Sequence, residues 1–285
     1  MKQVTGEQLK KIQLEILDVV TQFCDANGIR YWLDSGTLLG AIRHKGYIPW
    51  DDDVDLGMLR EDYERFLSIF NKSNDRYRAV SLENDPKFYL PFTKVCDTTT
   101  VLYEPDEKGF KLHINVDVFP YDRAPDDDKI AGEMFDRRDA LRRIHSIQST
   151  PAFGNIVTKP LRGFRKLAYR VLYRGKIIQQ MIDNATRFAK ADTKRVGDFT
   201  GFSRMMCDRR VFDSFAWVEF EGTQYKAPVG WDEWLTCYYG DYMQLPPENE
   251  RVTHHSFVAY RNDGESITET MRDGYPDIQN NNGEN

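Results

Sequence analysis

The chain has 285 residues, of which 40% are hydrophobic and 13% aromatic, so it can bury a core and wholesale disorder is excluded. Its 39 basic and 45 acidic residues leave a net charge of -6, which argues against nucleic acid as a partner because nucleic-acid binders present a basic surface. No stretch approaches the roughly 18 apolar residues of a membrane span. The N-terminal residues predict an amphipathic helix and not a signal peptide. The four cysteines form no C-x-x-C pair, which favours free thiols in a reducing cytosol.

The first 125 residues alternate between predicted helices and strands. A capping box of Thr5 and Gln8, followed by apolar residues at three- and four-residue steps, predicts a helix over residues 5–27 that ends at Asn27-Gly28. The other predicted elements are strands over 29–33, 53–58, 92–103 and 113–119, the last closed by Pro120, and helices over 38–43 and 61–70.

A different region begins at the acidic run 126–128 and is predicted to be mainly helical to about residue 195. From Ala140 to Ile182 it has no acidic residue, and its nine basic residues are Arg142, Arg143, Lys159, Arg162, Arg165, Lys166, Arg170, Arg174 and Lys176. This basic patch predicts either a solvated helical face or a docking surface for an anionic membrane leaflet or a lipid-linked glycan.

These patterns divide the chain into four parts. They are a core over 1–125, a basic helical region over 126–200, a C-terminal segment that packs on the core over 201–276, and a disordered tail over 277–285. The aromatic residues that we expect in the core of the C-terminal segment are Trp231, Trp234, Tyr238 and Tyr239.

Four carboxylates lie within five positions, at Asp51, Asp52, Asp53 and Asp55. On a strand, Asp53 and Asp55 would project to the same side about 6–7 Å apart. Like charges this close need a cation or raised pKa values, and oxygen-only ligands favour Mg²⁺ or Mn²⁺. A solvated acidic turn is one alternative, which the apolar flanks of the cluster disfavour. An EF-hand is another, which Leu56 at the obligatory glycine position disfavours.

The turn Ser35-Gly36-Thr37 precedes a predicted short helix, so its backbone N–H groups can hold a phosphate. A phosphate cradle beside paired metal-binding carboxylates is typical of phosphoryl or nucleotidyl transfer. Two-metal chemistry needs a further carboxylate from a separate strand. Asp117 is the best candidate because it lies on the polar face of a strictly alternating strand, and an exposed strand acid is the alternative.

The segment GTLLGAIRHKGYIPWDDDVDLGM, residues 36–58, is similar to the signature of the LicD family, the phosphorylcholine transferases and their fukutin-related relatives. NVDVFP at 115–120 resembles the second acidic strand of the family, and 231–255 its C-terminal segment. The resemblance covers about residues 8–125 and 215–260 and is poor across the basic region. It implies an α+β fold of the nucleotidyltransferase type, similar to the palm of polymerase β, in which a mixed sheet is flanked by helices and a helical region is added.

The resemblance also implies residue roles. Asp53 and Asp55 would bind both metal ions, while Asp117 would complete one metal site and help to deprotonate the acceptor hydroxyl. The residues that would bind the substrates are Ser35, Gly36, Thr37, Arg43, Lys94, Asp51 and Asp52. A surface charge without such a role is the alternative for Arg43 and for Lys94.

The implied activity is a Mg²⁺-dependent transfer of phosphocholine, or a related phospho-alcohol, from a CDP-activated donor to a hydroxyl of a glycan or lipid-linked glycan, with CMP leaving. Such an enzyme would be cytoplasmic and peripheral at the inner face of the membrane. The alternatives are a true nucleotidyltransferase that transfers NMP, a glycosyltransferase with a D-x-D metal motif, and a non-catalytic glycan- or Ca²⁺-binding module.

Overall fold

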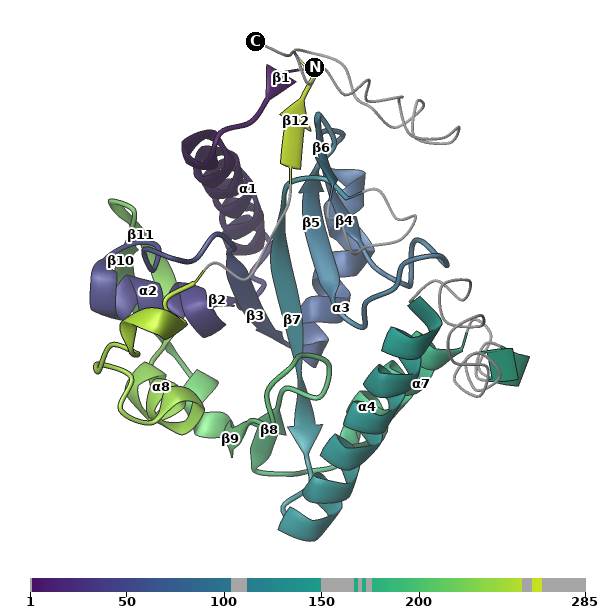
Figure 1. Ribbon diagram of the computed structural model, residues 1–285. Helices are drawn as coiled ribbons and strands as arrows, with labels where there is room; N and C mark the ends of the chain where they lie inside the picture. The colour runs from purple at the N-terminus through teal and green to yellow at the C-terminus, as the bar shows by residue number, and fades with distance from the viewer. Residues whose placement is uncertain are drawn as a thin grey trace.

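A computed structural model describes residues 2–103, 112–149, 167–168, 171–172, 176–252 and 258–262 of the chain (Figure 1). The strands are β1 (Lys2–Gln3), β2 (Trp32–Leu33), β3 (Asp55–Leu59), β4 (Tyr77–Val80), β5 (Thr93–Asp97), β6 (Thr100–Tyr103), β7 (Asn115–Ala124), β8 (Arg195–Gly197), β9 (Met206–Asp208), β10 (Phe215–Phe220), β11 (Thr223–Pro228) and β12 (Val258–Arg261). The α-helices are α1 (Gly6–Ala26), α2 (Ser35–His44), α3 (Arg60–Ile69), α4 (Asp128–Ser149), α7 (Ile177–Ala185) and α8 (Trp231–Tyr239).

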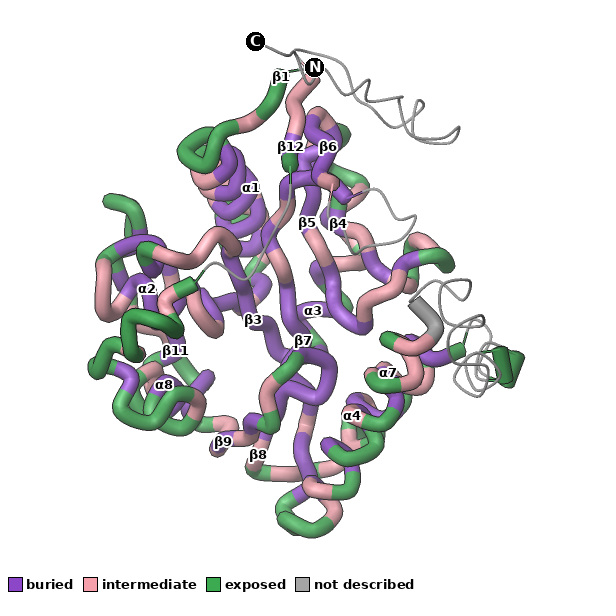
Figure 2. The backbone as a smooth tube through the Cα atoms, viewed as in Figure 1, coloured by how far each residue is buried: buried purple, intermediate pink, exposed green. Residues whose placement is uncertain are grey.

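A seven-stranded mixed sheet forms the centre of the molecule. Its main path is β2-β3-β7-β5-β4, and β8 and β9 continue from the far end of β7. Strands β3 and β7 are parallel, whereas β2 with β3, β7 with β5 and β5 with β4 are antiparallel. Figure 2 shows that β3, β5 and β7 are buried along most of their length. The predicted α+β fold with a mixed sheet flanked by helices is therefore confirmed.

Helices α1 and α3 cover the same face of this sheet. The Phe23 ring of α1 contacts the rings of Phe66 and Phe70 at centroid distances of 6.1 and 5.1 Å. Tyr63 of α3 forms a 2.6 Å hydrogen bond with the Thr93 hydroxyl of β5, so α3 lies directly on the sheet. The side chains that point to the opposite face are therefore not covered by these two helices.

The first helix confirms the sequence prediction closely. The Gln8 N–H donates to Thr5 Oγ1 at 3.3 Å and the Thr5 N–H donates to Gln8 Oε1 at 3.0 Å, which completes the predicted capping box. The helix ends before Asn27, and Gly28 adopts a φ of 62°, a left-handed conformation that glycine adopts without steric penalty.

Strand β7 is longer than predicted, because it continues through Pro120 to Ala124. Asp117 donates its N–H to the carbonyl of Val54, the residue directly before β3, so by alternation the nitrogen of Pro120 faces the other side of the strand. On that side the pairing with β5 ends at Val118. Pro120 therefore removes no ladder hydrogen bond, and the prediction that it closes the strand is wrong.

Two other strand boundaries also differ from prediction. The expected strand over 92–103 is divided by the turn at Thr98-Thr99 into β5 and β6, which belong to different sheets. The strand expected from Asp53 begins only at Asp55, the first residue that pairs with β7.

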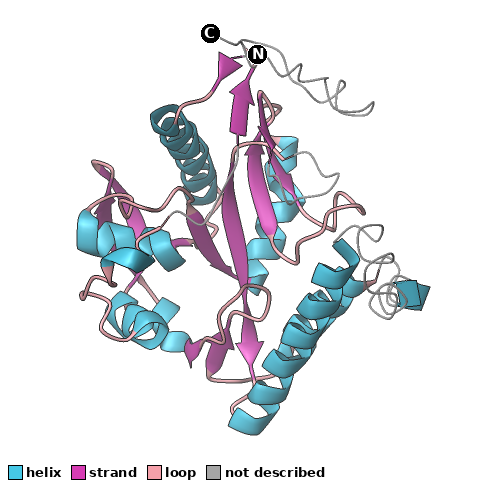
Figure 3. Ribbon diagram, in the orientation of Figure 1, coloured by secondary structure: helices cyan, strands magenta, loops and turns pink. Residues whose placement is uncertain are grey.

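The basic patch is only partly described. Helices α4 and α7 pack together through Leu141, Ile177 and Met181, and they stand beside the end of β7 (Figure 3). Arg142 donates to the Gly201 carbonyl at 3.0 Å and lies 3.8 Å from the Phe202 ring centroid, so it packs against a loop instead of joining a solvated face. The basic residues outside the described part are Lys159, Arg162, Arg165, Lys166, Arg170 and Arg174, and the tail 277–285 is also outside it. Among the described residues, no helix is long and apolar enough to cross a bilayer.

The C-terminal segment shares the core of the sheet. Trp234 of α8 is fully buried and packs against Tyr121 and Phe212 at centroid distances of 5.3 and 5.7 Å. The prediction of a core position is therefore confirmed for Trp234. It is wrong for Tyr239, at the end of the same helix, which is 38% exposed.

Candidate active site

Three charged side chains form a row across adjacent strands of the central sheet. Asp55 of β3 is the direct partner of Asp117 on the parallel strand β7, and Asp117 is in turn the partner of Lys94 on β5. Directly opposed residues project to the same face of a sheet. The neighbour of Lys94, Thr93, points to α3, so this row faces away from α3.

Lys94 neutralises Asp117 in this row. Its ammonium donates to both carboxylate oxygens of Asp117 at 2.7 and 2.9 Å, and to Asn115 Oδ1 at 3.2 Å. The two charged side chains are only 14% and 16% exposed, so the pair is largely shielded from water. The ammonium of Lys94 thus lies against the carboxylate of Asp117. A contact of Lys94 with the donor diphosphate stays a prediction.

Asp55 is the most buried acid of the cluster, with 9% of its surface exposed. Burial raises its pKa well above the usual range, and the nearby charges of Asp53, Asp117, Asp34 and Asp51 raise it further. Asp53 lies in the loop before β3 and not on the strand, but its charge still acts on Asp55. The acids therefore converge on a site where a bound cation would be stabilised.

The first turn of α2 lies against the start of β3. The Asp55 N–H donates to Thr37 Oγ1 at 2.8 Å, so the buried Thr37 side chain braces Asp55. A Cβ atom on Gly36 would lie 2.7 Å from Asp51 Oδ2, closer than any ordinary contact. Glycine at position 36 therefore lets the Asp51 carboxylate approach the N-terminal turn, where Ser35 has a φ of 46°.

A buried acid that the sequence analysis did not identify supports this turn. Asp34, the N-cap residue of α2, accepts hydrogen bonds from the Tyr121 hydroxyl at 2.6 Å and from Trp234 Nε1 at 3.3 Å. Its own N–H donates to the Asp55 carbonyl at 3.0 Å. Burial raises its pKa to about 6, although these hydrogen bonds lower it. The sequence signal that could have identified Asp34 is an aspartate at the N-cap position, directly before the helix start Ser-Gly-Thr.

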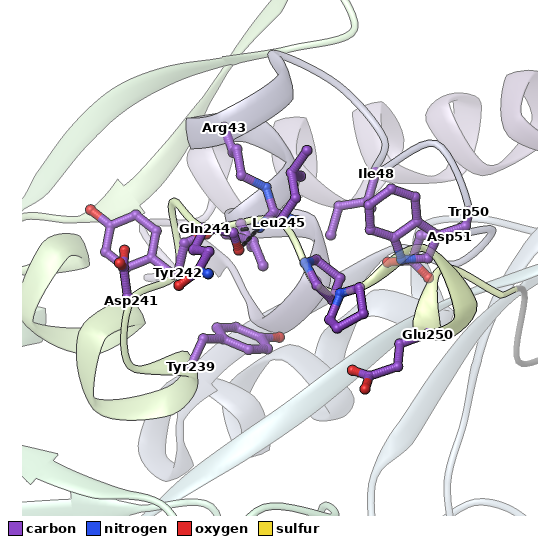
Figure 4. Close-up of a pocket in the computed structure, with 14 residues that line it drawn as sticks. Arg43, Ile48, Trp50, Asp51, Tyr239, Asp241, Tyr242, Gln244, Leu245 and Glu250 are labelled. Carbon is purple, nitrogen blue, oxygen red and sulfur yellow. Dashed lines mark hydrogen bonds between the residues drawn. The ribbon is translucent and has the colours of Figure 1, made fainter.

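Two cavities flank the acids. The larger has a volume of about 630 Å³, and among its lining residues are Gly36, Arg43, Trp50, Asp51, Tyr239, Tyr242 and Glu250 (Figure 4). The smaller, of about 50 Å³, is lined in part by Asp52, Asp53, Lys94, Asn115 and Asp117. Of the substrate-binding residues predicted from the sequence, Gly36, Arg43 and Asp51 line the larger cavity, and Asp52 and Lys94 line the smaller one.

Arg43 lines the larger cavity, but its guanidinium is used within the protein. Its Nη1 donates to the carbonyls of Tyr242 at 2.7 Å and Gln244 at 3.4 Å. Arg43 therefore fixes the segment after α8 against α2, and its predicted contact with the donor diphosphate stays a prediction.

The donor chemistry of the site fits a hard divalent cation. Asp53, Asp55 and Asp117 offer only oxygen, as Mg²⁺ and Mn²⁺ prefer. The raised pKa of Asp55 reflects negative charge that a cation would offset. In the described part of the chain, however, no three acid, histidine or cysteine side chains are already arranged around one ion position. Binding of a divalent cation by these three acids is therefore a proposal.

Known proteins are similar to this chain over the segments that carry these residues. The family model described as LicD/FKTN/FKRP, nucleotidyltransferase domain, matches residues 28–148, which include Ser35, Asp55, Lys94 and Asp117. The chain is 32% identical over 269 residues to the lipopolysaccharide cholinephosphotransferase LicD of Haemophilus influenzae, covering 91% of this chain and 99% of that protein. An uncharacterized protein of Rickettsia prowazekii is 40% identical over 122 residues, 40% of this chain and 44% of that protein. The human ribitol 5-phosphate transferase FKRP is 63% identical over 38 residues, 13% of this chain and 8% of that protein. The chain therefore belongs to the LicD family and is an enzyme, a transferase with a nucleotidyltransferase-like fold.

Proposed function

We propose that the chain transfers phosphocholine, or a closely related phospho-alcohol, from a CDP-activated donor to a hydroxyl of a glycan or lipid-linked glycan, and releases CMP. The similarity to a lipopolysaccharide cholinephosphotransferase over nearly the whole chain supports this substrate class. The observation that carries the proposal is the row of Lys94, Asp117 and Asp55 beside the first turn of α2. It combines carboxylates for proton transfer and cation binding with backbone N–H groups for a phosphate.

In this proposal the donor diphosphate lies at the N-terminal turn, against the backbone of Ser35 and Gly36. The acceptor oxygen attacks the phosphorus that carries the alcohol, the bond from that phosphorus to CMP breaks, and CMP leaves with the electron pair. The acceptor proton passes to the Asp117 carboxylate. Lys94 holds that carboxylate in place through two hydrogen bonds to its oxygens.

The cofactor would be Mg²⁺ or Mn²⁺, held by Asp53, Asp55 and Asp117. When bound, it would neutralise charge on the diphosphate and lower the pKa of the acceptor hydroxyl. Thr37 contributes by accepting a hydrogen bond from the backbone of Asp55. Asp34 contributes by holding the N-terminal turn of α2 through the hydrogen bond that it accepts from Tyr121.

The proposal places the enzyme in the cytoplasm, at the inner face of a membrane that carries a lipid-linked acceptor. The run of basic residues between Ala140 and Ile182 supports this location, because each cation near an anionic surface contributes about 1 kcal/mol. Leu167, Val171 and Leu172, which lie between the cations of this run, are exposed, as an interfacial segment requires.

A panel of donors tests the substrate class. The purified chain is incubated with Mg²⁺, a lipo-oligosaccharide acceptor and CDP-choline, CDP-ethanolamine or CDP-ribitol, and CMP is measured by chromatography. Release of CMP that depends on both acceptor and a CDP-alcohol supports the proposal. Release of the phospho-alcohol from the donor, with transfer of CMP to the acceptor, would instead identify a nucleotidyltransferase. Preference for CDP-ribitol would align the chain with the activity for which FKRP is named.

A further inference from the structure

The larger cavity is bounded by three segments that lie far apart in the sequence. They are the first turns of α2, the loop before β3 and the stretch that follows α8. In Figure 4, Trp50 and Asp51 lie on one side of the cavity and Tyr239 on the other. Because Gly36 and Asp51 belong to both the cavity wall and the acid site, a donor whose phosphates lie on the α2 turn can extend a neighbouring group into this cavity.

The charge of the cavity wall selects the kind of group that fits. Three carboxylates line it, those of Asp51, Asp241 and Glu250, against one guanidinium, that of Arg43. Arg43 directs its Nη1 donor to two backbone carbonyls of the protein. The wall therefore carries an excess of negative charge, which repels further phosphate and attracts a cation.

Trp50 already accepts a cation from the protein itself. The guanidinium carbon of Arg251 lies 5.7 Å from the centroid of the Trp50 ring. Arg251 is held there by a 2.9 Å hydrogen bond from its Nε to the Pro246 carbonyl. The indole of Trp50 is half-buried at the cavity wall, where a cation over an aromatic face is bound more strongly than in open water.

Tyr239 connects the cavity to the acid row. It reaches into the cavity from the end of α8, and Glu250 extends toward it from the opposite side (Figure 4). Burial raises the pKa of its phenol well above the usual range, and the charges of Tyr238, Asp55, Asp34 and Asp51 raise it further. Tyr239 is 38% exposed and lines the cavity, while the charges of Asp55 and Asp51 act on its phenol, so the residue lies between the cavity and the acid site.

We propose that this cavity is the subsite for the alkylammonium headgroup of the donor, with Trp50 and Tyr239 in contact with the cation and with Asp51 and Glu250 supplying negative charge around it. This inference rests on the proposed function, since it assumes a CDP-alcohol donor. A quaternary ammonium donates no hydrogen bond, so aromatic faces and carboxylates recognise it through charge alone. A neutral polyol such as ribitol lacks the charge and would need hydrogen-bond partners, so the subsite discriminates against it.

The test compares CDP-choline with its neutral isostere, CDP-3,3-dimethylbutanol, in which carbon replaces the nitrogen. Titration calorimetry in Mg²⁺ measures both affinities, together with that of CMP, for the wild type and for Trp50→Leu, Tyr239→Leu and Glu250→Gln. The wild type should bind CDP-choline at least about tenfold more tightly than the isostere. Each variant should reduce that ratio several-fold and leave the affinity for CMP unchanged. Tyr239→Phe should preserve the ratio because the ring remains.

Trp217→Leu is the matched control, because Trp217 on β10 is 60% exposed and does not line the cavity. Its ratio should equal that of the wild type. Glu250 is exposed, so Glu250→Gln removes charge without altering the core. A wild-type ratio near one, a ratio unchanged in Trp50→Leu, Tyr239→Leu and Glu250→Gln, or an equal loss of CMP affinity in these variants overturns the headgroup subsite. These are equilibrium affinities, so a chain that discriminates as expected but never releases CMP from a CDP-alcohol refutes the proposed reaction and leaves the subsite in place.

Discussion

Asp55 and Asp117 are direct partners on the parallel strands β3 and β7, and their side chains project to the same face of the sheet. This register brings two acids that are 62 positions apart in the sequence into one site. Two carboxylates so placed repel one another unless a proton or a cation offsets their charge. Lys94 provides that charge for Asp117, and the nearby charges of Asp117 and Asp53 act with burial to raise the pKa of Asp55.

Asp55→Asn should abolish turnover and weaken Mg²⁺ binding, because it removes a ligand of the proposed metal site. The free energy of unfolding should stay the same or rise, since the substitution relieves repulsion among buried acids. Calorimetric Mg²⁺ titration, a donor-release assay and thermal denaturation measure the three quantities. Asp53→Asn is expected to act in the same direction. Wild-type activity in either variant would remove Asp53 and Asp55 from the metal site.

Asp117→Asn should lower kcat by about 10²–10⁴-fold with little change in the KM for the donor, because a proton acceptor acts in the transfer step and not in donor binding. The measurement is steady-state kinetics with varied donor. An equal loss of donor affinity and of rate would assign Asp117 to binding instead.

Lys94→Met should destabilise the protein, because the carboxylate of Asp117 would face Asp55 without the two hydrogen bonds and the positive charge of Lys94. Adding Asp117→Asn to Lys94→Met should restore part of that loss. A double-mutant cycle in urea should therefore give a coupling energy of about 1–3 kcal/mol. Additive effects of the two substitutions would mean that the pair contributes nothing to folding.

Gly36→Ala should raise the KM for the donor while the protein stays folded. The new Cβ meets only the carboxylate of Asp51, which can move, and alanine is favoured over glycine inside a helix by about 0.5–1 kcal/mol. Gly132→Ala in α4 is the matched control, because no atom lies within 4 Å of its added Cβ. That control should gain stability and keep wild-type kinetics. Identical kinetics in both variants would show that the Asp51 carboxylate can move away from the N-terminal turn of α2 without any effect on donor binding.

Much of the fold follows from local pattern, and much of the site does not. The capping box of Thr5 and Gln8 and the alternation before Asp117 depend on neighbouring residues, so the sequence predicts them. The register of Asp55 against Asp117 depends on parallel pairing across a long connection, which no local pattern encodes. The same reason explains Pro120, because its tolerance within β7 depends on where the pairing with β5 ends.

The larger cavity could not be predicted for a related reason. Its wall contains Trp50 and Asp51 together with Tyr239, which lies nearly two hundred residues later in the sequence. The hydrogen bonds of Arg43 hold the segment after α8 in this position. An aromatic residue at helical spacing is usually part of a core, and the sequence alone gives no sign that Tyr239 leaves it at the end of α8.

The contribution of His113 to stability should fall as the pH drops from about 7 toward 5. Burial lowers the pKa of His113, although its contact with the Thr100 carbonyl and the charge of Asp97 act in the opposite direction. In the unfolded chain His113 binds a proton near pH 6.5, whereas in the folded protein it does so only at lower pH. The stability that the neutral His113 contributes is therefore fully present above pH 6.5 and declines below it. His113 alone accounts for up to about 1.4 kcal/mol per pH unit in that window. His113→Asn should flatten the dependence, as measured by urea denaturation at several pH values, and an unchanged slope would contradict it.

Simultaneous replacement of Arg162, Arg165, Arg170 and Arg174 by Gln should weaken binding to anionic liposomes by at least about a hundredfold at low salt. Binding by the wild type should fall as salt rises. The control replaces four exposed lysines outside the basic patch, Lys11, Lys72, Lys87 and Lys190, and removes the same charge. Equal flotation of both variants would show that the basic patch is only a solvated face.

The most direct test of the proposed reaction is the mass of the acceptor after incubation with CDP-choline and Mg²⁺. A lipo-oligosaccharide acceptor is analysed by mass spectrometry with the wild type and with Asp55→Asn. We predict that the wild type adds one phosphocholine group to the acceptor and releases CMP, and that Asp55→Asn adds nothing. An acceptor that gains CMP, or an Asp55→Asn variant that modifies the acceptor as the wild type does, would contradict this account.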